Sequence, residues 1–73
     1  MRQLAPRITQ DPKILHGRPI IEGTRVPVAG ILGHLAAGDQ VVDLAEEYGV
    51  TCEDIHACLA YAAELVSRKQ QVK

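Results

Sequence analysis

The chain has no tryptophan, no phenylalanine and only two tyrosines among its 73 residues. Its hydrophobic core therefore has to be built from isoleucine, leucine, valine and alanine. A chain of this length buries only about 60% of the surface that its unfolded form exposes, so the folded state is marginally stable alone. These absences predict one small domain over residues 1–73 that associates with itself as a homodimer.

Cysteine is also scarce, with only Cys52 and Cys58 present. The two lie on one predicted helix at a spacing that points them to different faces, so they cannot bridge each other. No cysteine or histidine pair has zinc-site spacing, and we expect no metal and no cofactor. Because there is no signal peptide and no long apolar run, we expect a cytoplasmic protein that does not enter a membrane.

Lysine and arginine are missing from the forty-two residues between Val26 and Ser67. That stretch contains seven carboxylates, namely Asp39, Asp43, Glu46, Glu47, Glu53, Asp54 and Glu64. The preceding segment contains five cations, namely Arg2, Arg7, Lys13, Arg18 and Arg25. Segregation of this kind indicates a dipolar molecule, and two interpretations stay open: it meets a copy of itself head to side, or it offers two differently charged faces to two partners.

For residues 1–26 we predict an extended or β arm, and we expect residues 1–6 to be loose. Around a turn at Gly23–Thr24, the β-branched residues of the segment 18–28 favour an irregular β-hairpin. Pro19 and Pro27 cannot donate to a ladder, so any strand is short or lies at an edge. The apolar residues Ile20, Ile21 and Val26 need cover, which also favours a dimer.

Residues 27–69 predict a unit of three helices. The first begins at Pro27 or Val28, since proline suits the first helical turn, and Gly38 ends it. The second starts after Asp39, which is a good N-cap residue, and ends at Gly49.

The third helix opens with a capping box that runs from Thr51 to Asp54. Its apolar stripe consists of Ile55, Leu59, Ala62 and Val66.

From Val41 to Cys58 the spacing is typical of a helix-turn-helix. The predicted fold is therefore mainly α, a compact three-helix homeodomain-like bundle with a short N-terminal β arm or hairpin. The second helix of the motif would present Thr51, Cys52, Glu53, His56 and Ala57, a surface that repels phosphates. We therefore favour a packing role for the motif, and any contact with DNA is assigned to Arg18 and Arg25.

No catalytic constellation is visible. His16, His34 and His56 lie on different predicted elements, and the adjacent Glu46 and Glu47 point away from each other on a helix. We therefore expect a protein that is not an enzyme.

The most specific local motif is Gly23-Thr24-Arg25-Val26-Pro27-Val28, preceded by Gly17-Arg18-Pro19-Ile20-Ile21. Two interpretations stay open at this point. Either Thr24 caps the turn and Arg25 pairs with a nearby acid, or both residues bind a partner.

These motifs, together with Asp11-Pro12, Leu35-Ala36-Ala37-Gly38, Asp54-Ile55 and Ala60-Tyr61-Ala62, resemble the family called domain of unknown function 433. The resemblance covers roughly Ile8 to Ala63. This family is similar to the antitoxin halves of VapB–VapC-like pairs, whose partner is a small nuclease-like toxin with a PIN-type fold. The resemblance implies a homeodomain-like unit with a β arm, often dimeric, without catalytic residues. The chain departs from the family's pattern at His16 and in its short tail after Val66.

The resemblance thus implies the antitoxin of a type II toxin–antitoxin pair, which neutralises a PIN-like ribonuclease, with repression of its own promoter as an added role. Because a ribonuclease needs a basic channel for RNA, the acidic helical surface around Glu46 and Glu47 is a candidate contact. Two alternatives stay open, a helix-turn-helix DNA-binding regulator without a toxin, and a homodimeric adaptor.

Overall fold

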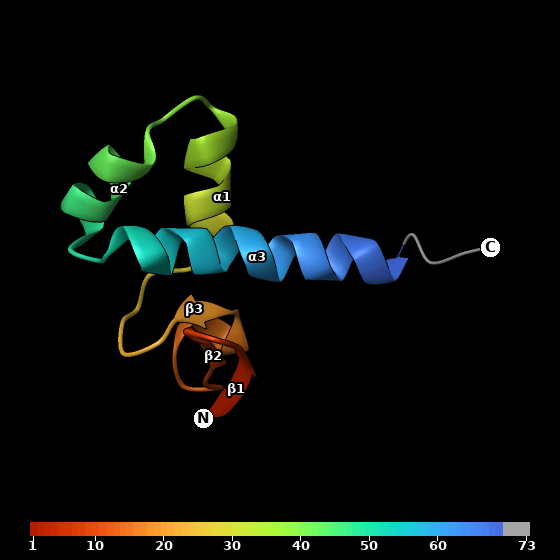
Figure 1. The fold of residues 1–73 in the computed structure, drawn as a ribbon. Coiled ribbons are helices and arrows are strands. Elements are labelled where there is room, and N and C mark those ends of the chain that lie inside the picture. Colours follow the sequence, from red (N-terminus) through yellow and green to blue (C-terminus); the bar gives the residue numbers. More distant parts are fainter. Residues whose placement is uncertain (70–73) are drawn as a thin grey trace.

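The computed structural model describes residues 1–69, which form a small sheet and three α-helices (Figure 1). The strands are β1 (Arg2–Ala5), β2 (Ile8–Gln10) and β3 (Ile20–Ile21), with a short 3-10 helix η1 (Leu15–Gly17) before β3. The helices are α1 (Val28–Ala36), α2 (Val41–Tyr48) and α3 (Cys52–Lys69). In Figure 1 the first half of α3 lies between α1 and α2 on one side and the sheet on the other.

The arm is a three-stranded antiparallel sheet in the order β1-β2-β3. The expectation that residues 1–6 are loose is wrong, because β1 pairs with β2, with Gln3 opposite Thr9. The four residues of β1 are too few to show a periodic pattern, and their backbone groups find hydrogen-bond partners only once β2 lies beside them. As the prolines predicted, β3 has only two residues and lies at an edge of the sheet.

Beyond β3 the chain turns back as an irregular hairpin. The Ile21 N–H donates to the Val26 carbonyl at 3.0 Å, and Ile20 pairs with Pro27 in an isolated bridge. Ile20 and Ile21 are almost fully buried within their own chain, with 2% and 1% of their surface exposed. The expectation that the arm needs a second copy to cover it is therefore wrong, since the helices and the segment before β3 bury it.

The helix boundaries follow the predicted signals with one exception. Helix α1 begins at Val28 after Pro27, and α2 ends at Gly49, whose φ of 69° is the left-handed conformation that favours glycine. The N-cap of α2, however, is Gln40 and not Asp39. Asp39 directs its carboxylate to His34 at 2.8 Å, and this contact competes with a capping role.

The core lies where the sheet meets the three helices. Its buried members are Ile8, Ile21, Val28, Ile31, Leu44, Ala45, Ile55 and Cys58. Burying one isoleucine stabilises the fold by about 1.5–3 kcal/mol, so this small aliphatic cluster supplies most of the stability. The predicted mainly α fold is confirmed in this form, three helices with a small sheet. The homeodomain-like arrangement stays a prediction.

The apolar stripe predicted for α3 is only partly buried. Ile55 is fully buried, but 41% of Leu59 and 52% of Val66 are exposed. The reason is visible in Figure 1, where the second half of α3 extends beyond α1, α2 and the sheet. None of the helices within residues 1–69 is both long and apolar enough to cross a membrane.

Candidate partner-binding surfaces

The turn in the Gly23–Pro27 segment is stabilised by one threonine side chain in addition to backbone hydrogen bonds. Thr24 Oγ1 donates to the Ile21 carbonyl at 2.7 Å and accepts from the Val26 N–H at 2.9 Å. Gly23 has a φ of 77°, which places it in the left-handed region at the tip of the turn. Thr24 thus stabilises its own turn, which is the first of the two interpretations that the sequence left open, and its hydroxyl is already engaged.

Arg25, by contrast, is exposed and forms no salt bridge with any residue of the described chain, 1–69. The local pair between Arg25 and an acid, which was part of the first interpretation, is therefore not formed among the described residues. In the helical block it is Asp54 that pairs with a cation of the arm, because its Oδ1 lies 2.9 Å from Nη1 of Arg7.

Asp54 joins the arm to the start of α3. Its second carboxylate oxygen accepts from the Thr51 N–H at 3.0 Å, and its own N–H donates to Thr51 Oγ1 at 3.0 Å. This reciprocal pair is the predicted capping box. The sequence showed the box, but nothing in it linked Asp54 to a residue 47 positions earlier.

The electrostatics of this link favour the charged forms of both partners. Burial raises the pKa of Asp54, but hydrogen bonds from the Thr51 backbone and the Arg7 guanidinium lower it, and the net pKa lies below its usual value. The hydrogen bond to Asp54 raises the pKa of Arg7. Arg7 thus links the arm to the start of α3 through a charge-assisted hydrogen bond at the surface.

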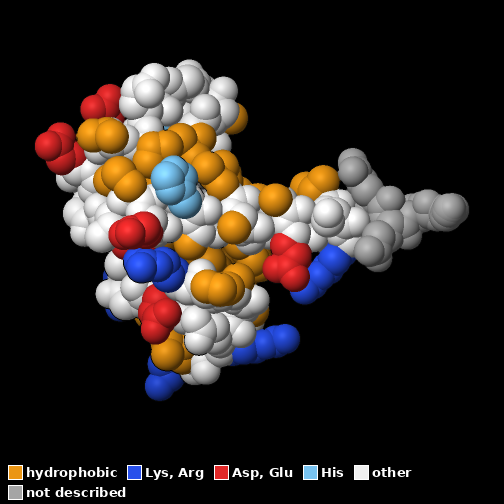
Figure 2. All heavy atoms as spheres, viewed as in Figure 1, with side chains coloured by type: hydrophobic (Ala, Val, Ile, Leu, Met, Phe, Trp, Pro, Cys, Tyr) orange, Lys and Arg blue, Asp and Glu red, His pale blue; other side chains and the backbone are white. Residues whose placement is uncertain are grey.

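The remaining cations of the arm form a basic pole, which we define as Arg2, Lys13, Arg18 and Arg25. All four are exposed, and none forms a salt bridge in the part of the chain that the structure describes. Arg2 and Arg25 line two hollows that share Met1. In Figure 2 most blue side chains lie in the lower half of the molecule, on the arm.

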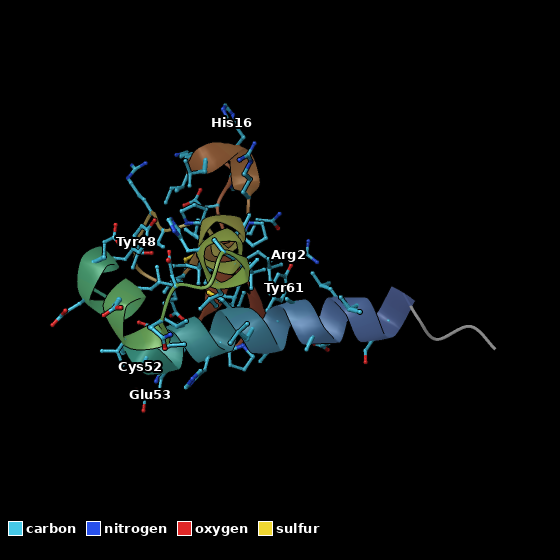
Figure 3. All side chains as sticks on the ribbon, turned by 90° about the horizontal axis from the view of Figure 1, so that it is seen from above. Arg2, His16, Tyr48, Cys52, Glu53 and Tyr61 are labelled. Atoms are coloured by element: carbon cyan, nitrogen blue, oxygen red, sulfur yellow. The ribbon has the colours of Figure 1, made fainter. Side chains whose placement is uncertain are left out.

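The acidic pole lies on α2 and consists of Asp43, Glu46 and Glu47. All three are exposed, and within residues 1–69 none of them pairs with a cation. Figure 1 places α2 and the sheet on opposite sides of α3, so the two poles are well separated. The exposed residues at the start of α3 include Cys52 and Glu53 (Figure 3), and none is basic, as the sequence predicted.

Polar contacts that the sequence did not reveal connect α1 to α2. His34 Nδ1 lies 2.8 Å from Asp39 Oδ2, and His34 Nε2 lies 3.1 Å from the Tyr48 hydroxyl. The rings of His34 and Tyr48 meet edge to face at 6.0 Å. Because each ring nitrogen already has a partner within its own fold, we interpret His34 as a link between the helices.

Neither cysteine belongs to a site. Cys52 is exposed and Cys58 buried, which confirms that they occupy different faces, and both thiols are free. Burial raises the pKa of Cys58 to about 11, with a smaller effect from Asp54. Within residues 1–69 no three histidine, cysteine or carboxylate side chains gather in a way that could hold a metal ion.

Residues 8–62 match the family described as "Protein of unknown function (DUF433)". The chain belongs to the DUF433 family. The match covers the arm from β2 onward, all of α1 and α2, and the buried half of α3.

Two relatives are similar to this chain in sequence. The chain is 36% identical over 52 residues to "Putative antitoxin VapB45" of Mycobacterium tuberculosis, covering 71% of this chain and 22% of the relative. It is 38% identical over 56 residues to "Uncharacterized protein y4eO" of Sinorhizobium fredii, covering 75% of this chain and 25% of that protein. The chain therefore spans about a quarter of the length of these relatives.

A solved structure shares the fold. The crystal structure of Rv2018 from Mycobacterium tuberculosis superposes with a TM-score of 0.66 at 36% identity, over 71% of this chain and 24% of the other.

Proposed function

We propose that this DUF433 protein is the antitoxin of a type II toxin–antitoxin pair, that it is not an enzyme, and that it acts in the cytoplasm. The similarity to a relative named as an antitoxin supports the class of function. The observation in the structure that carries the proposal is the acidic pole of α2. Its three carboxylates are exposed, they form no ion pair with the residues that the structure describes, and α2 lies on the opposite side of α3 from the arm.

The proposed partner is a PIN-like ribonuclease toxin. A ribonuclease that binds RNA presents a positive surface around its active site, and an exposed acidic helix is electrostatically complementary to that surface. Antitoxin binding at the acidic pole would cover the entry to the RNA channel. Steering of this kind acts mainly on the association rate and weakens as salt screens the charges.

The test is to purify the chain with the nuclease encoded beside it and to measure RNA cleavage. We expect a stable complex and loss of cleavage at equimolar antitoxin. The double reversal Glu46→Lys and Glu47→Lys should slow association at low salt and flatten its salt dependence. A matched control, Lys13→Glu on the arm, should leave association unchanged. If excess antitoxin leaves the nuclease fully active, the proposal fails.

We further propose that the protein represses its own promoter through the basic pole, as a homodimer. Phosphate contacts require exposed cations, and the arm supplies four that form no ion pair with any residue of the range 1–69, whereas the first turns of α3 carry no Lys or Arg. Joint replacement of Arg18 and Arg25 by alanine should abolish a gel shift on promoter DNA, while His56→Ala should leave it intact. The opposite pattern would assign DNA contact to the helix-turn-helix.

One alternative rests on the same basic pole, a DNA-binding regulator without a toxin. A gel shift on promoter DNA without any nuclease in the complex would favour it. A chain that binds neither DNA nor a nuclease but dimerises would be the homodimeric adaptor.

A further inference from the structure

The face of the sheet that points away from α3 carries a hollow of about 460 Å³. Ile8 of β2 and Ile21 of β3 belong to the core, together with Ile55 of α3. Neighbouring residues of a strand point to opposite faces, so Thr9 and Ile20 face the other way. Both line the hollow, and their residues are 1% and 2% exposed. The volume lies within the range of pockets that bind small ligands, about 300–1,000 Å³.

The floor of this hollow carries a hydroxyl group that the chain leaves without a partner. Thr9 Oγ1 is buried, and it forms no hydrogen bond with any residue in the range 1–69. A buried hydroxyl without a hydrogen bond destabilises the folded state, so its presence in a protein calls for an explanation. A polar group of a bound ligand would supply the missing hydrogen bond.

Two side chains of opposite charge line the same hollow. Arg25 and Asp11 both contribute to it, and neither forms an ion pair within the described residues, 1–69. Arg25 follows Thr24, whose hydroxyl stabilises the turn that presents the guanidinium. Asp11 Oδ1 accepts from the Lys13 N–H at 2.9 Å, a contact that uses only one of the two carboxylate oxygens. The lining thus offers a cation and an anion that do not pair with each other.

We propose that this hollow binds a free α-amino acid with an aliphatic side chain. The carboxylate of the ligand pairs with Arg25, and its ammonium group pairs with Asp11. The Thr9 hydroxyl donates to the ligand carboxylate. Ile14 and Ile20 supply the apolar part of the lining, against which the aliphatic side chain packs.

The combination of charges distinguishes this ligand from other classes. A phosphate group could pair with Arg25, but it would also meet the carboxylate of Asp11, which repels it. A purely apolar molecule would bury both charges and the Thr9 hydroxyl without giving them partners, which opposes binding. A zwitterion with an apolar side chain satisfies every polar group named in the lining.

Titration of the purified chain with L-leucine, followed in its backbone amide NMR spectrum, tests the proposal. Because the hollow is open and Arg25 is exposed, we expect a Kd of about 0.1–1 mM. Isocaproate lacks the ammonium group of leucine, isoamylamine lacks the carboxylate, and glycine lacks the aliphatic side chain. Each of the three should bind about tenfold more weakly than leucine or worse.

Charge variants identify the two polar contacts. Arg25→Gln and Asp11→Asn should each weaken leucine binding by about tenfold or more, because each removes one charge. Asp11→Asn retains an oxygen that can accept from the Lys13 N–H. The matched controls are Arg18→Gln and Glu22→Gln, which lie on the arm but do not line the hollow. Both controls should leave the affinity for leucine unchanged.

Thr9→Val separates a binding role from a structural one. A threonine that is needed for folding would lose stability when its hydroxyl is removed. This variant should instead keep or gain unfolding free energy, because the hydroxyl has no partner inside the described chain. Its affinity for leucine should nevertheless fall by about tenfold.

Three results would overturn the proposal. The first is that about 10 mM leucine shifts none of the amide signals of Thr9, Gly23 and Arg25. The second is equal affinity for leucine and isocaproate with no effect of Asp11→Asn, which would show a site for carboxylates in general. The third is tighter binding of inorganic phosphate than of leucine, which would show a site for the DNA backbone.

The proposed repressor function uses Arg25 as well, so a bound amino acid should weaken the gel shift on promoter DNA. This last expectation rests on the proposed function, whereas the NMR titration does not. If leucine binds but promoter DNA is not shifted, the amino-acid site stands and the repressor function fails. If promoter DNA is shifted but leucine does not bind, the repressor function stands and the amino-acid site is wrong.

Discussion

Two buried or half-buried threonines provide a direct test of the structural role of the Gly23–Pro27 motif. Thr24 Oγ1 makes two hydrogen bonds inside its turn, at 2.7 and 2.9 Å. Thr9 is 1% exposed, and its hydroxyl has no hydrogen-bond partner among the described residues. Valine has nearly the shape of threonine without the hydroxyl. The same substitution should therefore change stability in opposite directions at the two positions.

The expected magnitudes follow from the hydrogen bonds that each site has. Thr24→Val removes two bonds and leaves the Val26 N–H and the Ile21 carbonyl without this partner, so it should cost about 2 kcal/mol of unfolding free energy. Thr9→Val removes a buried hydroxyl that has no partner, so it should be neutral or stabilise by about 1 kcal/mol. In a domain of this size each kcal/mol shifts the melting temperature by about 4–8 °C.

Urea unfolding followed by circular dichroism measures both effects. All variants should be compared at one protein concentration, because self-association of the kind proposed would add to the apparent stability. An unchanged denaturant slope would show that the variants differ in stability alone. If Thr24→Val is neutral, the motif is not held by its threonine, and a partner-binding role for that hydroxyl becomes the better explanation. If Thr9→Val costs more than about 1 kcal/mol of unfolding free energy, the Thr9 hydroxyl has a hydrogen-bond partner in solution.

Three further predictions concern the core and the start of α3. Asp54→Ala should cost about 1 kcal/mol at neutral pH through loss of the cap, with Glu53→Ala as a near-neutral control. Because folding lowers the pKa of Asp54, its contribution is complete above the usual carboxyl pKa and is lost as pH falls through the lowered value, so the cost should shrink in acid. With the pKa of Cys58 raised to about 11, a thiol reagent at pH 8 should label Cys52 in the native protein and Cys58 only after unfolding. Ile55→Ala, at a fully buried position, should cost about 2–5 kcal/mol in the same urea assay.

Local signals in the sequence determined most of the helical structure. Proline at the start of α1, glycine at the end of α2 and the Thr51–Asp54 capping box act within a few residues, and the structure has all three where they were predicted. The membership of the family was also readable from the sequence, because its motifs cover residues 8–62. Such features depend on backbone conformations and hydrogen bonds between near neighbours, which the amino-acid types alone specify.

Tertiary structure decided which side chains remain free to act. Arg7 and Asp54 lie 47 positions apart, and only the packing of the arm against α3 pairs them, whereas Arg25 forms no ion pair within residues 1–69. Asp39 had the character of a helix cap, but folding brings His34 close enough to take its carboxylate. The apolar stripe on α3 could be predicted from the helix periodicity. That periodicity does not show at which residue of α3 the sheet and the other helices stop covering it. Burial depends on what lies opposite, and for Leu59 and Val66 the chain's own fold places too little there to cover them.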